Sequence, residues 1–246
     1  MGLWDYVVKL SGWTQPPAVP VPEEDKTSEN DDLPNGPTLQ PAPVDSLAAG
    51  AGGALRLRKF DPTVLEKSDT ILVLGRRRAG KSTLSTEIIH KMGVKLEDLR
   101  EGTGLSEEEV RELFNLQRAA GAKAKDLLVV ADDSEPALGH LHAVLMNGRR
   151  CHLGLLKELQ HPVILPPLQR SAFDWVFIYP DTSEQYMRKA WENYANNIPT
   201  FSAFRCIMQS LTGFQVLVID RKKPGAVPLP DQLFWYEANE ADFGKR

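Results

Sequence analysis

Residues 75–83, with the sequence GRRRAGKST, carry the clearest chemical pattern in this 246-residue chain. They match the phosphate-binding loop pattern G-x-x-x-x-G-K-[ST] at every fixed position. In such a loop the backbone N–H groups face the phosphates, the lysine reaches the β- and γ-phosphates, and the hydroxyl ligates Mg²⁺. The alternative is a glycine-rich turn that holds no ligand. The pattern predicts ATP and Mg²⁺ bound by Gly75, Arg76, Arg77, Arg78, Ala79, Gly80, Lys81, Ser82 and Thr83, with Lys81 catalytic and Ser82 on the metal.

Two adjacent carboxylates, Asp132 and Asp133, follow the apolar run at residues 127–131. A phosphate-loop enzyme also needs an acid at the end of a neighbouring strand to hold Mg²⁺, and this pattern predicts Asp132 as that metal ligand. Asp133 then occupies the place where motor ATPases often carry the carboxylate that polarises the attacking water. Alternatively, both acids cap the helix that follows, because carboxylates favour helix N-termini.

A glutamine, Gln160, ends another apolar run that begins at Cys151. Ligands of parallel sheets bind at the carboxyl ends of the strands, so we expect Gln160 at the same edge as Gly75 and Asp132. A side-chain amide there can hydrogen-bond the γ-phosphate or the attacking water. A polar loop residue with no such role is the alternative.

The elements that must position these residues alternate along the chain. Apolar runs predict buried strands, and amphipathic stretches between them predict helices, one of which starts at a capping box formed by Ser106 and Glu109. This order predicts an α/β fold with a mostly parallel central sheet and helices on both faces. The predicted strands are 69–75, 126–133, 151–160, 175–180 and a final 214–220, and the predicted helices are 81–92, 106–121, 135–149, 183–197 and 201–212.

The order of motifs resembles the poxvirus and giant-virus type of genome-packaging ATPase, a P-loop motor family of the RecA-like FtsK–HerA clan. The resemblance covers roughly residues 66–221 and rests on the phosphate loop, the Asp pair, Gln160 and two arginine-bearing turns. Those turns contain Asn147, Gly148 and Arg149, and Pro166 or Pro167 with Arg170. The chain departs from the family in having Arg150 in place of histidine, and in showing no clear strand between Met92 and Lys125.

The resemblance implies an ATPase that translocates double-stranded DNA into a viral capsid, with Asp133 activating water and Gln160 sensing the γ-phosphate. It also implies a homo-oligomeric ring, in which an arginine from a neighbouring subunit completes the site. Arg149 and Arg170 are the catalytic candidates for that arginine, and Arg150 is a further one. DNA contacts should be with phosphates and therefore non-specific. The role of Arg76, Arg77 and Arg78 toward nucleotide, neighbour or solvent stays open.

Two other functions remain alternatives. A P-loop protein of another type would be a small-molecule kinase or a GTPase, but the chain has no Asn-Lys-x-Asp motif for reading guanine and a poor candidate for a kinase lid. The shortened segment between residues 92 and 125 could instead leave a nucleotide-binding assembly factor that does not hydrolyse ATP.

Composition divides the chain into three parts: a short apolar segment at 1–13, a Pro-rich acidic linker at 14–55 and a P-loop ATPase domain at 56–246. The linker contains eight prolines, and its seven acids and one base bring its charge to −6 against −4 for the chain. Such a composition predicts disorder. With two cysteines, Cys151 and Cys206, the chain has no disulfide framework. No apolar run is long enough to cross a membrane. We expect a viral protein of the infected cell, associated with the assembling virion in cytoplasm or nucleus.

The apolar N-terminal segment could tether the motor to a capsid or virion-membrane protein. Deleting residues 1–50 should then spare ATP hydrolysis and impair assembly, because the catalytic pattern begins after residue 56. The measurement is ATP turnover by the truncated chain beside its incorporation into particles. Loss of hydrolysis in the truncated chain would contradict the tether.

Overall fold

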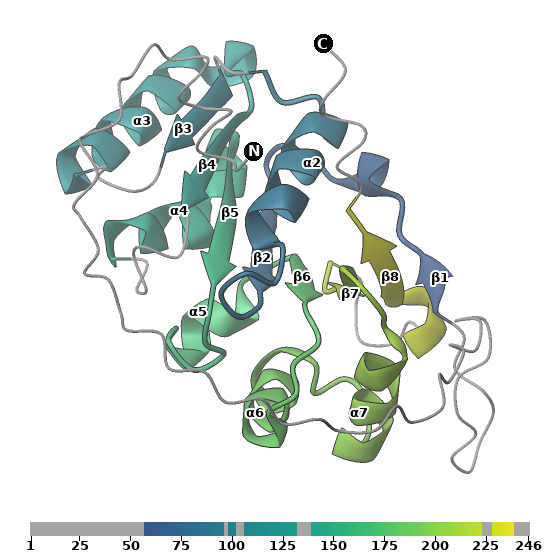
Figure 1. Ribbon diagram of the computed structural model, residues 1–246. Coiled ribbons are helices and arrows are strands. Elements are labelled where there is room, and N and C mark those ends of the chain that lie inside the picture. The colour runs from purple at the N-terminus through teal and green to yellow at the C-terminus, as the bar shows by residue number, and fades with distance from the viewer. Residues whose placement is uncertain (1–56, 96–97, 102–105, 132–138, 223–227, 239–246) are drawn as a thin grey trace, which may run out of the picture.

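The computed structural model describes residues 57–95, 98–101, 106–131, 139–222 and 228–238 (Figure 1). The predicted N-terminal segment and linker lie outside the described residues, as do Asp132 and Asp133. The domain boundary at residue 56 therefore stays a prediction. None of the described helices has the length and apolar character needed to cross a lipid bilayer.

The described residues form one eight-stranded sheet in the order β1-β8-β7-β6-β2-β5-β4-β3. Among the described strands, only β7 runs against the others, which are mutually parallel. The predicted mostly parallel α/β sheet is thus confirmed. The strands are β1 (Arg58–Lys59), β2 (Thr70–Leu74), β3 (Leu99–Glu101), β4 (Leu127–Ala131), β5 (Leu153–Leu159), β6 (Trp175–Ile178), β7 (Gln215–Asp220) and β8 (Leu233–Glu237).

Helices cover both faces of the sheet, as predicted, but unevenly (Figure 1). One face packs against α2, and the opposite face packs against the remaining larger helices. The predicted capping box at the start of α3 is present, with the Ser106 and Glu109 side chains each accepting from the other's backbone N–H. The α-helices are α2 (Lys81–Lys91), α3 (Glu107–Ala120), α4 (His142–Asn147), α5 (Pro167–Ser171), α6 (Glu184–Tyr194) and α7 (Phe201–Ser210).

Strand β2 leads into the phosphate loop and lies in the centre of the sheet between β5 and β6. Its side chains alternate, so that Ile71 and Val73 enter the core under α2 while Leu72 and Leu74 enter the opposite core. All four are fully buried. Two-sided burial explains why the strand has a continuous apolar sequence instead of alternating polar and apolar residues.

Two edge features correct the expectations from sequence. The segment from Met92 to Lys125 does contain a strand, the three-residue β3, which pairs in parallel with β4. It was missed because three residues are too few to show an alternation, and charged Arg100 and Glu101 occupy two of them. Strand β7 is not the last, because β8 pairs antiparallel with it and extends the sheet.

A buried carboxylate, Asp69, anchors the amino end of β2. One oxygen accepts hydrogen bonds from Arg149 at 2.7 Å and Lys222 at 2.9 Å. The other accepts from the indole of Trp175 and the backbone N–H of Glu66, both at 2.9 Å. Asp69 is fully buried, so these partners replace the water that its charge has lost. The network joins β2 to β6 and to the segments that follow α4 and β7.

We expect Asp69→Asn to lower the free energy of unfolding by about 1–3 kcal/mol, because it weakens the hydrogen bonds of a buried charged group whose basic partners keep contact with water. The neutral amide leaves the Arg149 and Lys222 charges without their shared partner. Glu66→Gln is the control, because Glu66 is an exposed partner of Lys222 and its loss should cost under about 0.5 kcal/mol. Chemical denaturation of the two variants measures both effects, and equal small losses would contradict this role of Asp69.

Candidate functional site

The phosphate loop is held by both strands that flank β2. The Gly75 N–H donates to the Leu159 carbonyl of β5 at 3.0 Å, and the Tyr179 N–H donates to the Leu74 carbonyl at 2.8 Å. The loop therefore leaves the carboxyl edge of the sheet from a strand fixed on both sides. This edge is the expected ligand side of a parallel sheet.

The loop backbone has the geometry that the sequence pattern demands. Gly80 precedes α2 with φ of +98°, a left-handed conformation that a side chain makes costly. A Cβ there would also lie 3.1 Å from the Phe214 ring and 3.2 Å from the Tyr179 hydroxyl. Lys81 is buried, and its ammonium donates to the Arg76 carbonyl at 3.3 Å within the loop. The N-terminus of α2 and the Lys81 ammonium thus both lie at the loop, which suits an anionic phosphate.

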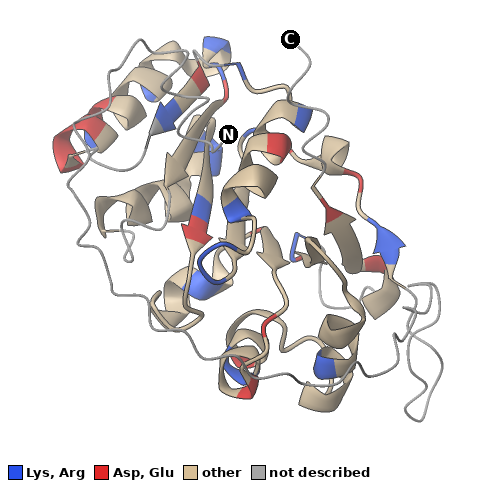
Figure 2. Ribbon diagram, in the orientation of Figure 1, with Lys and Arg blue, Asp and Glu red and all other residues tan. Residues whose placement is uncertain are grey.

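The three arginines of the loop differ in their surroundings. Arg76 forms an ion pair with Asp181 at 2.5 Å and lies over the Tyr186 ring, which ties the loop to the segment after β6. Arg77 and Arg78 are exposed, and Arg78 has φ of +67°. Figure 2 shows this basic loop beside the acidic carboxyl end of β5. Arg76 therefore has a structural partner in its own chain, whereas Arg77 and Arg78 face outward.

The predicted metal ligand Ser82 contacts a residue that the sequence did not single out. Its hydroxyl donates to the Glu158 carboxylate at 3.3 Å. Glu158 belongs to β5, only 2% of it is exposed, and it pairs in register with Val73 of β2. A carboxylate therefore lies within the sheet directly beneath the start of α2.

Tyr179 packs against the phosphate loop at Gly75 and Gly80. Its hydroxyl donates to the Gly80 carbonyl at 3.0 Å. Burial raises the pKa of the phenol well above its ordinary value, and the charges of Glu158 and Glu87 raise the pKa further. Both causes disfavour the phenolate, so Tyr179 remains a hydrogen-bond donor to the loop at physiological pH.

A cavity of about 380 Å³ adjoins the loop, lined by Gly80, Thr83, Tyr179, Phe214 and Ala238. Phe214 precedes β7 and is 59% exposed, unusual for a large aromatic side chain. Because β7 alone runs against the sheet, its amino end lies at the same edge as the phosphate loop. This arrangement brings an exposed aromatic ring to Gly80 across more than 130 residues of sequence.

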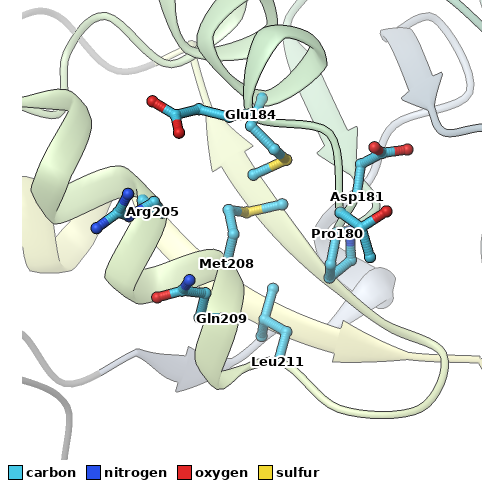
Figure 3. A pocket seen from close by; sticks show the side chains of 9 residues that line it. Pro180, Asp181, Glu184, Arg205, Met208, Gln209 and Leu211 are labelled. Carbon is cyan, nitrogen blue, oxygen red and sulfur yellow. The ribbon is translucent and has the colours of Figure 1, made fainter.

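A second cavity of about 520 Å³ lies at the same edge, between the segment after β6 and α7 (Figure 3). Met208 and Leu211 supply apolar surface, and Glu184 and Arg205 supply charge. Its Asp181 is the partner of Arg76. The cavity is therefore linked to the phosphate loop through one ion pair.

The structure places the other predicted nucleotide-site residues as follows. Gln160 comes directly after Leu159, whose carbonyl accepts from the Gly75 N–H, so its backbone lies beside the loop, and its role toward the γ-phosphate stays a prediction. Strand β4, which leads to Asp132 and Asp133, is separated from β2 by β5 and is not its immediate neighbour. The two acids lie outside the described residues, and their roles stay predictions.

The two arginines predicted as fingers both have partners in their own chain. Arg149 lies at the amino edge, opposite the phosphate loop, bonded to Asp69 and Asp174. Burial lowers its pKa, but the neighbouring acids outweigh that effect and raise it. Arg170 binds the carbonyls of Leu165 and Val163 and the side chain of Asn193. Neither arginine lies at its own phosphate loop, so the finger role stays a prediction that concerns a neighbouring subunit.

Sequence reasoning missed Glu158 and Phe214. Glu158 left a signal, since Lys157 and Glu158 are two charged residues inside an otherwise apolar buried run. Phe214 gave no such signal in the sequence, because an aromatic residue before an apolar strand is common. Its proximity to Gly80 depends on the direction of β7.

Comparison with known proteins gives viral relatives. No family model matches the chain. It is 35% identical over 101 residues to the uncharacterised protein L437 of Acanthamoeba polyphaga mimivirus, covering 41% of this chain and 35% of that protein. It is 25% identical over 198 residues to the uncharacterised protein 015R of Frog virus 3, covering 68% of this chain and 61% of that protein. The chain thus spans less than two thirds of either relative's length.

Among solved structures, the fold matches the genome-packaging NTPase B204 of Sulfolobus turreted icosahedral virus 2, solved in complex with AMPPCP. The TM-score is 0.50 at 13% identity, covering 71% of this chain and 100% of B204. The chain has the fold of a viral packaging NTPase. At this identity the likeness concerns the fold, so the chemistry of the site must come from the residues described above.

Proposed function

We propose that this chain is an ATPase that drives double-stranded DNA into a viral capsid. The observation that carries the proposal is the phosphate loop, with buried Lys81 and a left-handed Gly80, at the carboxyl edge of a packaging-NTPase fold. The viral origin of the relatives supports a role in the virus. A location at the assembling virion in the infected cell follows from this role.

The residues present fit Mg²⁺-ATP. Lys81 and the N-terminus of α2 supply positive charge for the phosphates, and the Ser82 hydroxyl supplies a ligand for Mg²⁺. Bound Mg²⁺ would neutralise charge that develops on the phosphate oxygens. Asp132 is the second proposed ligand, Asp133 the proposed base for water, and Gln160, beside Gly75, the proposed sensor of the γ-phosphate.

The remaining parts of the proposal concern assembly. An arginine from a neighbouring subunit would add positive charge in the transition state, which requires a closed ring with head-to-tail interfaces. Arg149 and Arg170 would have to give up their intrachain partners to serve, and Arg150, like Arg149, is exposed. DNA would be gripped through its phosphates, so binding should weaken steeply with salt.

The proposed activity predicts DNA-stimulated ATP hydrolysis that is lost in Lys81→Ala and in Asp133→Asn. Lys81→Ala removes the phosphate contact, whereas Asp133→Asn removes the base and should spare ATP binding. Losses of about 100-fold or more are expected for each, the usual effect of removing such a group. Phosphate release with and without DNA, and binding calorimetry, measure the two steps. Tight ATP binding without turnover in the wild type would instead support a non-hydrolysing assembly factor.

The cavity beside Gly80 predicts that the nucleotide base lies against the Phe214 ring. Phe214→Ala should weaken ATP binding about tenfold, because stacking of a base on an aromatic ring is worth about 1–3 kcal/mol. Phe214→Tyr keeps the ring and should restore binding. Leu168→Ala is the control, since Leu168 is equally exposed but lies on α5. Calorimetric titration with ATP distinguishes them, and unchanged affinity in Phe214→Ala would contradict the assignment.

A further inference from the structure

A buried carboxylate lies beneath the hydroxyl that the proposed function assigns to Mg²⁺. Glu158 is almost completely buried, and its Oε2 accepts from the Ser82 hydroxyl at 3.3 Å. The alternation of β5 places Leu156 and Glu158 on the face covered by α2, and Lys157 on the other. A carboxylate costs several kcal/mol to remove from water. Its presence in a strand that is otherwise largely apolar on this face therefore calls for a specific partner.

The chemistry of a hydroxyl ligand supplies a reason for that carboxylate. A serine that binds a metal through its oxygen must direct its proton elsewhere, because the lone pair has to face the ion. A charged acceptor makes the stronger hydrogen bond and raises the basicity of the ligand oxygen. We propose that Glu158 is a positioning residue that holds the Ser82 proton and so turns the Ser82 oxygen toward Mg²⁺.

This proposal rests on the proposed nucleotide site and extends it to a residue outside the phosphate loop. It differs from the assignment of Asp132, which would contact the ion itself. The competing explanation is structural: Ser82 is the second residue of α2, and a carboxylate near a helix N-terminus stabilises the helix. A structural role would change stability and overall nucleotide affinity but not the dependence of that affinity on Mg²⁺.

The chain contains a matched control in Glu87. It is also 2% exposed, lies five residues after Ser82 on α2, and accepts from the Tyr236 hydroxyl at 2.6 Å. Its charge also raises the pKa of Tyr179. Neutralising Glu87 therefore removes a buried charge from the same core without touching the proton of Ser82.

The experiment measures the affinity of the full chain for the non-hydrolysable analogue AMPPCP, with MgCl₂ and with EDTA. The ratio of the two affinities is the Mg²⁺ contribution. Glu158→Gln should lower this ratio about tenfold or more, the usual loss on removing a group behind a metal ligand. Affinity in EDTA should stay within about twofold of wild type. Glu87→Gln should leave the ratio unchanged.

Two further variants complete the test. Ser82→Ala by itself should lower the ratio of the two affinities. The double variant Ser82→Ala/Glu158→Gln should show the same ratio as Ser82→Ala, because both substitutions act through one hydroxyl. If Glu158→Gln does not fold, Glu158→Asp withdraws the carboxylate by one methylene and should lower the ratio likewise. An unchanged ratio, or equal losses with MgCl₂ and EDTA, would overturn the proposal. Absence of AMPPCP binding by the wild type in both conditions would instead refute the proposed function.

Discussion

The site depends on hydrogen bonds that hold the end of β2 from both sides. The Gly75 N–H is bonded to β5, and the Leu74 carbonyl is bonded to the residue after β6. A loop attached to an edge strand would have one such support. Because β2 is central, the turn that follows it starts from a fixed position, and Gly80 can hold its left-handed conformation where α2 begins. The geometry of the loop is therefore a consequence of sheet position as much as of glycine content.

The two ends of β2 serve different purposes. At the amino end, buried Asp69 gathers Arg149, Lys222 and Trp175 into a network that joins strands and turns. At the carboxyl end, Lys81 bonds the loop backbone and Ser82 bonds Glu158, at the place proposed for phosphate and metal. This separation explains why a motif arginine such as Arg149, which the family resemblance implies to be catalytic, lies far from its own loop. Within one chain its described contacts stabilise the sheet.

Much of the fold followed from the sequence because the central strands are long apolar runs bounded by clear turn and capping residues. The capping box at Ser106 and the two-sided burial of β2 are examples in which local pattern and tertiary environment agree. The edges were harder. Strand β3 is short and charged, and its existence depends on the ladder that β4 offers. The same holds for the candidate site. The loop residues are adjacent in sequence and could be predicted, whereas Glu158 and Phe214 are distant in sequence and lie near the loop only because of the order and direction of the strands.

The sequence by itself determined that a phosphate loop follows a buried strand and that strands alternate with helices. Those properties depend on residues within a few positions of one another, where glycine conformations, capping and hydrophobic periodicity act directly. Only the tertiary structure decided which distant residues complete the site. The register of β5 beside β2 brought Glu158 to Ser82, and the reversed β7 brought Phe214 to Gly80. Strand order and direction are set by burial and ladder pairing over the whole sheet, which no local pattern records.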